Sequence, residues 1–165
     1  MRQAETDRFD RNRKLYEIYK ANPDYYDVAF DEASGGMKAT HKKHCFDPDK
    51  GDYEKMVQNV GFNMGNSVVL TSEYGKAVGE NYFDGFWNGM SFEIGSSLGS
   101  GENNIKAILN HCRKKSAEIA IIFFPKKDLY SKDRVYDGIS KFNGQTSYRF
   151  SLIICIVENS LFIYK

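Results

Sequence analysis

The sequence predicts a single α+β domain, in which a central mixed sheet with one β-hairpin is flanked by three to four helices. Three observations support this class. Apolar residues recur at helical spacing in several segments, short apolar runs typical of strands lie between them, and the pair Asn88-Gly89 marks a tight hairpin. The 165 residues, 41% hydrophobic and 15% aromatic, suffice for one domain with a real core.

Residues 1–40 are predicted to hold one helix and two short strands. An apolar stripe over residues 6–20 indicates the helix, which Asn22-Pro23 should end. The stretch "YYDVAFDEASGGMKATH" that follows suggests two strands on either side of Gly35-Gly36. The remaining residues, 41–165, are expected to form the larger core of the same domain.

Within this core, helices and strands are predicted to alternate. Apolar residues from Tyr53 to Met64 lie at i, i+3, i+4, i+7 and i+11, which indicates a helix that Gly65 should stop. A second stripe, Ile105 to Cys112, indicates a helix over 102–116, and Ser131 is a suitable N-cap for a helix over 131–142. The apolar runs 67–71 and 118–124 are predicted strands, and two further strands are predicted in 149–165 with a turn near Glu158-Asn159.

The stretch "DGFWNGMSFEIG", residues 84–95, contains the predicted hairpin and two carboxylates. With Asn88-Gly89 as a two-residue type I′ loop, counting outward along both strands pairs Asp84 with Glu93. Like charges directly opposite each other are unfavourable, so a cation, a basic side chain, a shared proton or exposure to water should compensate them. The pair is therefore either a functional site or two solvated charges at a wet end of the sheet.

The order of these elements resembles the core of the restriction-endonuclease-like nucleases. A helix with Glu54 is followed by a strand, a strand with Asp84, a strand with Glu93, a helix and a strand. By this resemblance, Asp84 and Glu93 would hold a divalent metal, Mg²⁺ or Mn²⁺, that activates water against a phosphodiester, with Glu54 as a third acidic residue. Gly95 stands where that family's Glu-x-Lys motif has its lysine.

A second resemblance covers residues 41–124. The pattern "HCFDPDKGDYEKMVQNVGFNMGNSVVLTSE", "DGFWNGMSFEI" and "ENNIKAILNHCRKKSAEIAIIFF" is similar to nuclease toxin domains of phage head-associated proteins and contact-dependent inhibition toxins. These include the barnase/EndoU/colicin/RelE-like group. The resemblance implies a phage- or mobile-element-associated ribonuclease, with RNA as substrate and a cognate immunity protein or a phage or host protein as partner. The alternative is a catalytically inactive interaction module derived from a nuclease.

The three histidines lie in two clusters with cysteines. His41, His44 and Cys45 fall within "HKKHC", and His111 precedes Cys112. Their spacing matches no standard zinc pattern, so zinc is not expected, and Cys112 lies on a predicted buried stripe. His44 or His41 would suit a general acid or base in metal-free RNA cleavage, and surface histidines are the plain alternative.

Charged and polar residues around the predicted site are candidates for substrate contacts. Asn104, Lys106, Arg113 and Lys114 would bind RNA, although basic residues near the end of a helix also complement its dipole. With 23 Lys and Arg against 22 Asp and Glu, a net charge of +1 gives no global field that favours nucleic acid or membrane. The sequence shows no apolar run long enough to span a bilayer, no signal peptide and no paired cysteines. We therefore expect a cytoplasmic protein without membrane partners.

Overall fold

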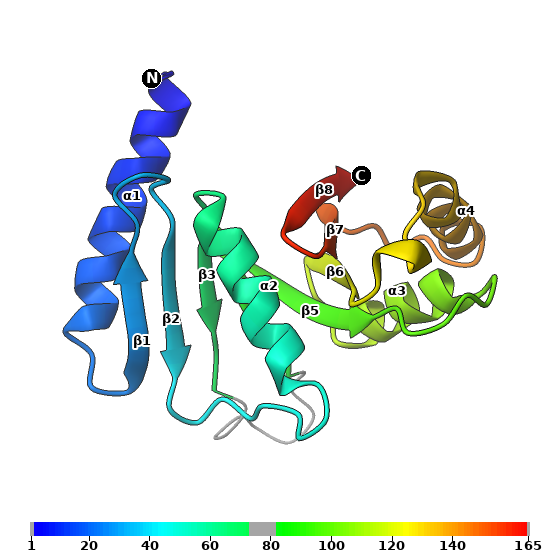
Figure 1. The fold of residues 1–165 in the computed structure, drawn as a ribbon, viewed down its shortest axis with the longest axis horizontal. Coiled ribbons are helices and arrows are strands. Elements are labelled where there is room, and N and C mark those ends of the chain that lie inside the picture. The colour runs from blue at the N-terminus through cyan, green and yellow to red at the C-terminus, as the bar shows by residue number, and fades with distance from the viewer. Residues whose placement is uncertain (1, 73–81, 165) are drawn as a thin grey trace. The chain divides into compact units, whose positions relative to one another are not determined.

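The computed structural model describes residues 2–72 and 82–164, which form four α-helices and eight strands (Figure 1). The strands pair both parallel and antiparallel in a mixed sheet, so the predicted α+β class is confirmed. The helices are α1 (Gln3–Lys20), α2 (Gly51–Asn63), α3 (Asn104–Lys114) and α4 (Lys132–Asn143), with a short 3₁₀ turn η1 (Lys127–Leu129). The strands are β1 (Tyr25–Phe30), β2 (Met37–His41), β3 (Ser67–Leu70), β4 (Gly85–Trp87), β5 (Met90–Ser96), β6 (Ile119–Phe124), β7 (Leu152–Val157) and β8 (Ser160–Tyr164).

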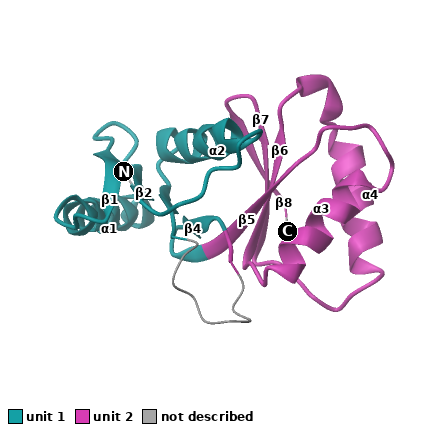
Figure 2. Ribbon diagram, turned by 90° about the horizontal axis from the view of Figure 1, so that it is seen from below, with its two compact units in different colours: residues 1–80, 84–90 teal, residues 81–83, 91–165 magenta. Residues whose placement is uncertain are grey.

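The chain divides into two compact units, coloured separately in Figure 2. Unit 1 comprises residues 1–80 and 84–90, and unit 2 comprises residues 81–83 and 91–165. Asp84 therefore belongs to unit 1, whereas Glu93 belongs to unit 2. The prediction of one domain over 1–165 remains a prediction.

In unit 1 the two helices cover opposite faces of the strands. Side chains of Met37, Ala39 and Val69 pack with aromatic and aliphatic residues of α1 and β1. Because side chains alternate along a strand, Lys38 and Thr40 point to the other face, where α2 lies over β2 and β3. On that face α2 comes close to the strands at Gly61, since a Cβ there would lie 2.5 Å from the Trp87 ring.

One buried amide fixes α1 to the turns of unit 1. The side chain of Asn12, which is 1% exposed, donates from Nδ2 to the carbonyl oxygens of Gly35 at 2.9 Å and Gly65 at 3.2 Å. Gly35 and Gly65 both have positive φ values, of 77° and 87°, so each carbonyl is presented by a turn that favours glycine. Asn12 thus joins the β1–β2 turn to the α2–β3 turn.

In unit 2, β6 lies between parallel neighbours β5 and β7, and every residue of β6 is buried. Helices α3 and α4 pack on one face, against Ala120, Ile122 and Phe124. Two glycines let these layers approach closely. A Cβ on Gly95 would lie 2.3 Å from Cγ2 of Ile108, and a Cβ on Gly138 would lie 2.4 Å from Cβ of Ile105. Strand β8 completes the unit by pairing antiparallel with β7.

Most predicted elements are observed within a few residues of their expected bounds. The Asn88-Gly89 turn has φ values of 48° and 86°, as a type I′ hairpin loop requires. The buried stripe of α3 consists of the predicted residues, and Ser131 caps α4 by accepting a hydrogen bond from the Arg134 N–H at 3.1 Å. The loop predicted around Gly75 and Gly79 lies outside the described residues.

The helix α2 is observed as predicted, but only part of its apolar stripe is buried. Met56 and Met64 are 44% and 49% exposed, whereas the polar Glu54 and Gln58 are buried beside Val57, Val60 and Gly61. Glu54 and Gln58 face inward because hydrogen-bond partners for their side chains lie on that side of the helix. None of the helices in the described part of the chain combines the length and the apolar character that crossing a membrane requires.

Replacing Asn12 with alanine should lower the free energy of unfolding by about 1–3 kcal/mol, because two buried carbonyl groups lose their donor. Urea denaturation of the variant measures this loss. Lys14→Ala, at an exposed position of the same helix, is the matched control and should change stability by about 0.5 kcal/mol or less. Equal stability of Asn12→Ala and wild type would contradict the tethering role.

Candidate functional site

The most concentrated set of buried polar groups in unit 1 surrounds His44. This residue lies in the segment between β2 and α2, and its ring contacts two other segments of the unit. Nδ1 lies 2.7 Å from the carbonyl oxygen of Thr71, just after β3, and Nε2 lies 3.2 Å from Oε1 of Glu54 in the first turn of α2. Because a carbonyl oxygen only accepts, Nδ1 carries a hydrogen, and both ring nitrogens are engaged.

Asp84 completes this group, which we name the His44 cluster: His44, Glu54, Asp84 and the Thr71 carbonyl. The backbone carbonyl of Asp84 accepts a hydrogen bond from the Thr71 N–H at 3.1 Å, which fixes the start of β4 next to the end of β3. Asp84 is 8% exposed. Oε2 of Glu54 is buried and accepts no hydrogen bond from the described residues. The cluster therefore holds more negative charge than its own hydrogen bonds satisfy.

The electrostatics of the cluster favour a charged histidine. The His44 side chain is fully buried and that of Glu54 is 12% exposed. Burial by itself lowers the pKa of His44, but the hydrogen bonds to Glu54 and Thr71 and the charges of Glu54 and Asp84 outweigh it, so the pKa of His44 is raised. The structure thus buries a contact between the His44 ring and the Glu54 carboxylate that favours the protonated form of the histidine.

Glu93 lies in a different setting, on β5 of unit 2 and next to α3. Its side chain is 7% exposed, and Oε1 lies 4.0 Å from Nε2 of His111 on α3. The Cys112 thiol, also on α3, donates to the backbone carbonyl of Glu93 at 3.5 Å. The predicted pairing of Asp84 with Glu93, and a shared metal between them, stays a prediction.

At Gly95, where the resemblance to nucleases leads one to expect a lysine, the packing of unit 2 leaves little space. A Cβ at this position would meet the Ile108 side chain at 2.3 Å, closer than carbon atoms approach in proteins. Gly95 points to the same face of β5 as Glu93, two residues earlier. This face of the strand is therefore in contact with α3, and a side chain longer than glycine would displace the helix.

The residues predicted to bind substrate are spread along α3. Asn104 and Arg113 are nine residues apart, which corresponds to about 14 Å along a helix. Oδ1 of Asn104 accepts hydrogen bonds from Ser97 Oγ at 2.6 Å and Arg134 at 3.3 Å. Lys106 is half-buried, Arg113 donates to Asn110 at 3.4 Å, and Lys114 is exposed. The structure does not gather these four side chains into one site.

Arg134 orders the loop "GSSLGSG", residues 95–101, at the end of β5. Its guanidinium donates to the carbonyl oxygens of Gly99 and Leu129 at 2.7 Å each, and to Ser97 Oγ at 3.3 Å. These acceptors hold the arginine in place as a structural group. Sequence reasoning missed this role, since an arginine in the first turn of α4 resembles any exposed helical residue.

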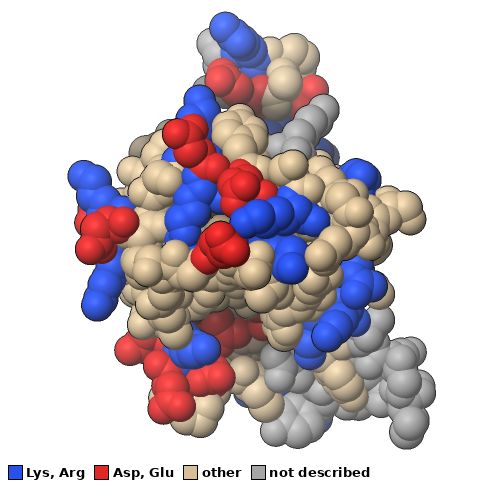
Figure 3. Space-filling model, turned by 90° about the vertical axis from the view of Figure 1, so that its right-hand side faces the viewer, with Lys and Arg blue, Asp and Glu red and all other residues tan. Residues whose placement is uncertain are grey.

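Charge on the surface is mixed rather than divided by sign. Figure 3 shows Lys and Arg side chains interspersed with Asp and Glu across the face that it views. Within residues 2–72 and 82–164, no group of three or more His, Cys, Asp or Glu side chains is arranged to hold a metal ion. In the His44 cluster this agrees with both ring nitrogens already having partners.

Comparisons with known proteins reveal a likeness of fold. No model of a protein family matches the sequence. No curated protein matches it either. Among solved structures, the fold is similar to one chain of the CdiA-CT/CdiI toxin and immunity complex from Burkholderia pseudomallei, with a TM-score of 0.56 and 18% identity, over 75% of this chain and 96% of that chain. At this identity the likeness concerns the fold alone, and it is consistent with the resemblance of the sequence to toxin-like domains.

The raised pKa of His44 predicts how stability depends on pH. In the unfolded chain His44 should titrate near 6.5, and in the folded chain above that value. Its contribution to stability is therefore fully present below about pH 6.5 and is lost as the pH rises through the folded pKa. Denaturant unfolding across this range should show stability falling with pH, with a shallower slope in His44→Gln. The control His41→Gln should keep the wild-type slope, and equal slopes in all three proteins would contradict the raised pKa of His44.

The close packing at Gly95 predicts a specific coupling with Ile108. Gly95→Ala should destabilise the protein by about 1–3 kcal/mol through overpacking. In an Ile108→Ala background, which removes the atom that the new Cβ would meet, the added cost should be much smaller. A double-mutant cycle of unfolding free energies measures the difference. Additive effects would show that α3 does not limit the side chain at this position.

Proposed function

We propose that this chain is a nuclease-derived interaction module of the toxin–immunity type, which binds a cognate protein and does not cleave RNA. The observation that carries the proposal is the contact between Gly95 and Ile108. The nuclease motif has a lysine at this position, whereas in this chain even a Cβ there would meet the Ile108 side chain at 2.3 Å.

The state of the other predicted catalytic residues supports this proposal. Nε2 and Nδ1 of His44 both have partners within the protein, and its side chain is fully buried, so the ring offers no nitrogen to a substrate. A general base needs to lie within hydrogen-bond reach of the proton that it takes. Glu93 lies against α3, where its Oε1 is 4.0 Å from Nε2 of His111. In this arrangement the carboxylates stabilise the fold.

A protein partner is supported by two observations. The fold is similar to a component of a toxin–immunity complex, in which two proteins bind each other. In addition, β8 ends the strand order and exposes Phe162 and Ile163 by 40% and 62%. Edge strands with exposed apolar side chains commonly pair with other proteins. We infer that the partner is a toxin or an immunity protein.

A ribonuclease is the second candidate, and the His44 cluster is the observation that favours it. A buried imidazolium, two carboxylates and an unsatisfied oxygen within one small region are typical of sites that move protons. In this reading, Glu54 takes the proton of a ribose 2′-hydroxyl as that oxygen attacks the phosphorus, the P–O5′ bond breaks and the leaving 5′-oxygen takes a proton from water, while His44 holds Glu54 in place as a positioning residue.

Purified protein distinguishes the two candidates. We expect no degradation of total RNA, with or without Mg²⁺ or Mn²⁺, no growth arrest on expression, and a one-to-one complex with the cognate protein by light scattering. If RNA is cleaved, and Glu54→Gln and Asp84→Asn abolish the cleavage while the control Glu118→Gln retains it, the interaction module is excluded in favour of the ribonuclease. Cleavage that survives both substitutions would exclude the His44 cluster as the site.

A further inference from the structure

We propose that a hollow on unit 1 binds one nucleotide, either free or as part of a single RNA strand. The hollow has a volume of about 380 Å³ and is lined by residues of β1, β2, α2 and the segment before α2. It lies on the α2 side of the strands, where α2 covers β2 and β3 and leaves Tyr26 of β1 46% exposed beside it (Figure 1). The inference is independent of the function proposed above.

The floor of the hollow contains a buried amide with one free acceptor. Gln58 is 2% exposed, and its Nε2 donates to the carbonyl oxygens of Ala39 at 3.0 Å and Val68 at 3.3 Å and to Oγ1 of Thr40 at 3.2 Å. These partners fix the orientation of the amide. Within residues 2–72 and 82–164, no donor reaches Oε1 of Gln58. This oxygen is the polar atom that Gln58 offers to a ligand.

Thr40 places a donor beside this acceptor. Its hydroxyl oxygen accepts from Gln58, so the hydroxyl hydrogen is left to donate, and the residue is 2% exposed. A hydroxyl donor next to an acceptor of fixed orientation matches the edge of a nucleobase, on which amino or imino hydrogens alternate with ring nitrogens or carbonyl oxygens. Proteins read bases in single-stranded RNA through such contacts.

The walls supply aromatic surface and one positive charge. Tyr26 offers a partly exposed ring, and Phe46 is held edge-on against His44 at 4.7 Å between ring centres. Nζ of Lys55 lies 4.8 Å from the centre of the Phe46 ring and has no carboxylate partner among the described residues. A base can therefore stack on an aromatic side chain while its phosphate meets Lys55.

The positive charges at the rim indicate how many phosphate groups of a ligand the hollow can bind. The neighbouring Lys38 is already engaged, with Asp27 at 3.3 Å and with Oδ1 of Asn59 at 3.1 Å. Lys55 is thus the uncommitted cation at this hollow among the described side chains. One lysine matches one phosphate group, as in a nucleoside monophosphate or a single link of an RNA chain.

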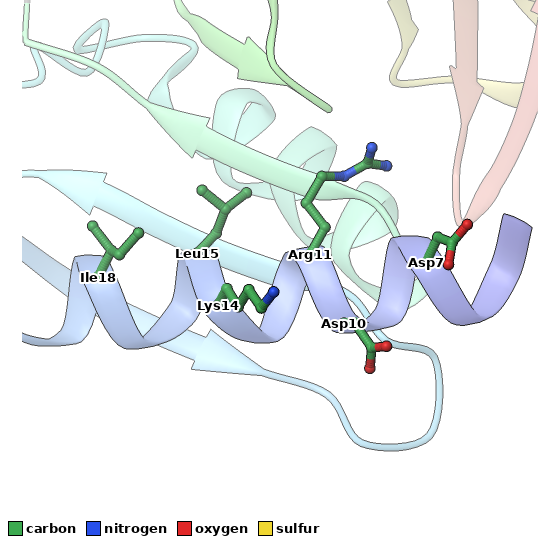
Figure 4. Close-up of a pocket in the computed structure, with 6 residues that line it drawn as sticks. All are labelled: Asp7, Asp10, Arg11, Lys14, Leu15 and Ile18. Atoms are coloured by element: carbon green, nitrogen blue, oxygen red, sulfur yellow. The ribbon is translucent and has the colours of Figure 1, made fainter.

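A second hollow on unit 1, of about 400 Å³, lacks these features. All the residues described around it belong to α1, and Figure 4 shows Arg11 pointing away from the side on which Asp10 lies. Its charged residues are exposed, and none is a buried polar group with a fixed orientation. It is the side of an exposed helix, whereas the hollow beside α2 has a floor, walls and a charged rim.

Two-dimensional NMR of the full chain titrated with AMP, GMP, CMP and UMP tests the proposal. We expect saturable shifts of the Gln58 side-chain amide and of the Tyr26 backbone amide with at least one nucleotide. Tyr26→Ala should weaken binding by a factor on the order of 10 to 100, through lost stacking. Lys55→Gln should weaken the monophosphate but not the corresponding nucleoside. A parallel titration with a short single-stranded RNA establishes whether a free nucleotide or a nucleotide of RNA binds more tightly.

Matched variants and a plain anion serve as controls. Tyr136→Ala in unit 2, where the ring is 53% exposed, and Lys43→Gln, at an exposed lysine, should bind as wild type does. Circular dichroism verifies that all four variants are folded. The proposal is overturned if inorganic phosphate produces the same shifts, if the control variants lose as much affinity, or if no nucleotide at millimolar concentration shifts Gln58. None of these results depends on whether the protein cleaves RNA or binds a protein partner.

Discussion

The two hydrogen bonds of the buried His44 ring hold unit 1 together on the α2 side of its strands. They join three segments far apart in the sequence: the stretch before α2, the first turn of α2 and the end of β3. A buried imidazolium that bonds a carboxylate and a carbonyl contributes more than a neutral hydrogen bond, whereas loss of either partner leaves an uncompensated polar group. The position of Phe46, which packs against the ring, depends on the same contacts.

Sequence patterns predicted the elements that pack through one apolar face. The stripe Ile105, Ile108, Leu109 and Cys112 was assigned correctly because α3 buries apolar side chains alone. The stripe of α2 was not, because Glu54 and Gln58 lie inward, where His44, Ala39 and Val68 supply partners. A periodicity rule counts every polar residue as exposed. Glu54 and Gln58 lie at i and i+4, on one face of α2, and this spacing was the available signal. Their hydrogen-bond partners are known only once the chain has folded.

The site itself was only partly predictable for a similar reason. His44, Glu54 and Asp84 were chosen from the sequence as separate candidates, and the structure brings them into one cluster in unit 1. The substrate contacts assigned to α3 stay a prediction, and the structure spreads them along the helix, since Asn104 and Arg113 lie nine residues apart. A motif read along the chain specifies residue types, whereas a site also requires that elements distant in sequence converge. The same fold can keep the residues and lose the chemistry.

Gly95 illustrates how packing and catalysis compete for one position. A catalytic lysine on β5 needs open space beside the strand, but close approach of α3 needs the absence of a side chain. Burial of Ile108 and its neighbours against β5 stabilises unit 2, and overpacking of such a contact costs about 1–3 kcal/mol. Glycine at position 95 therefore lets α3 lie close to β5, and a longer side chain would require Ile108 or the helix to move.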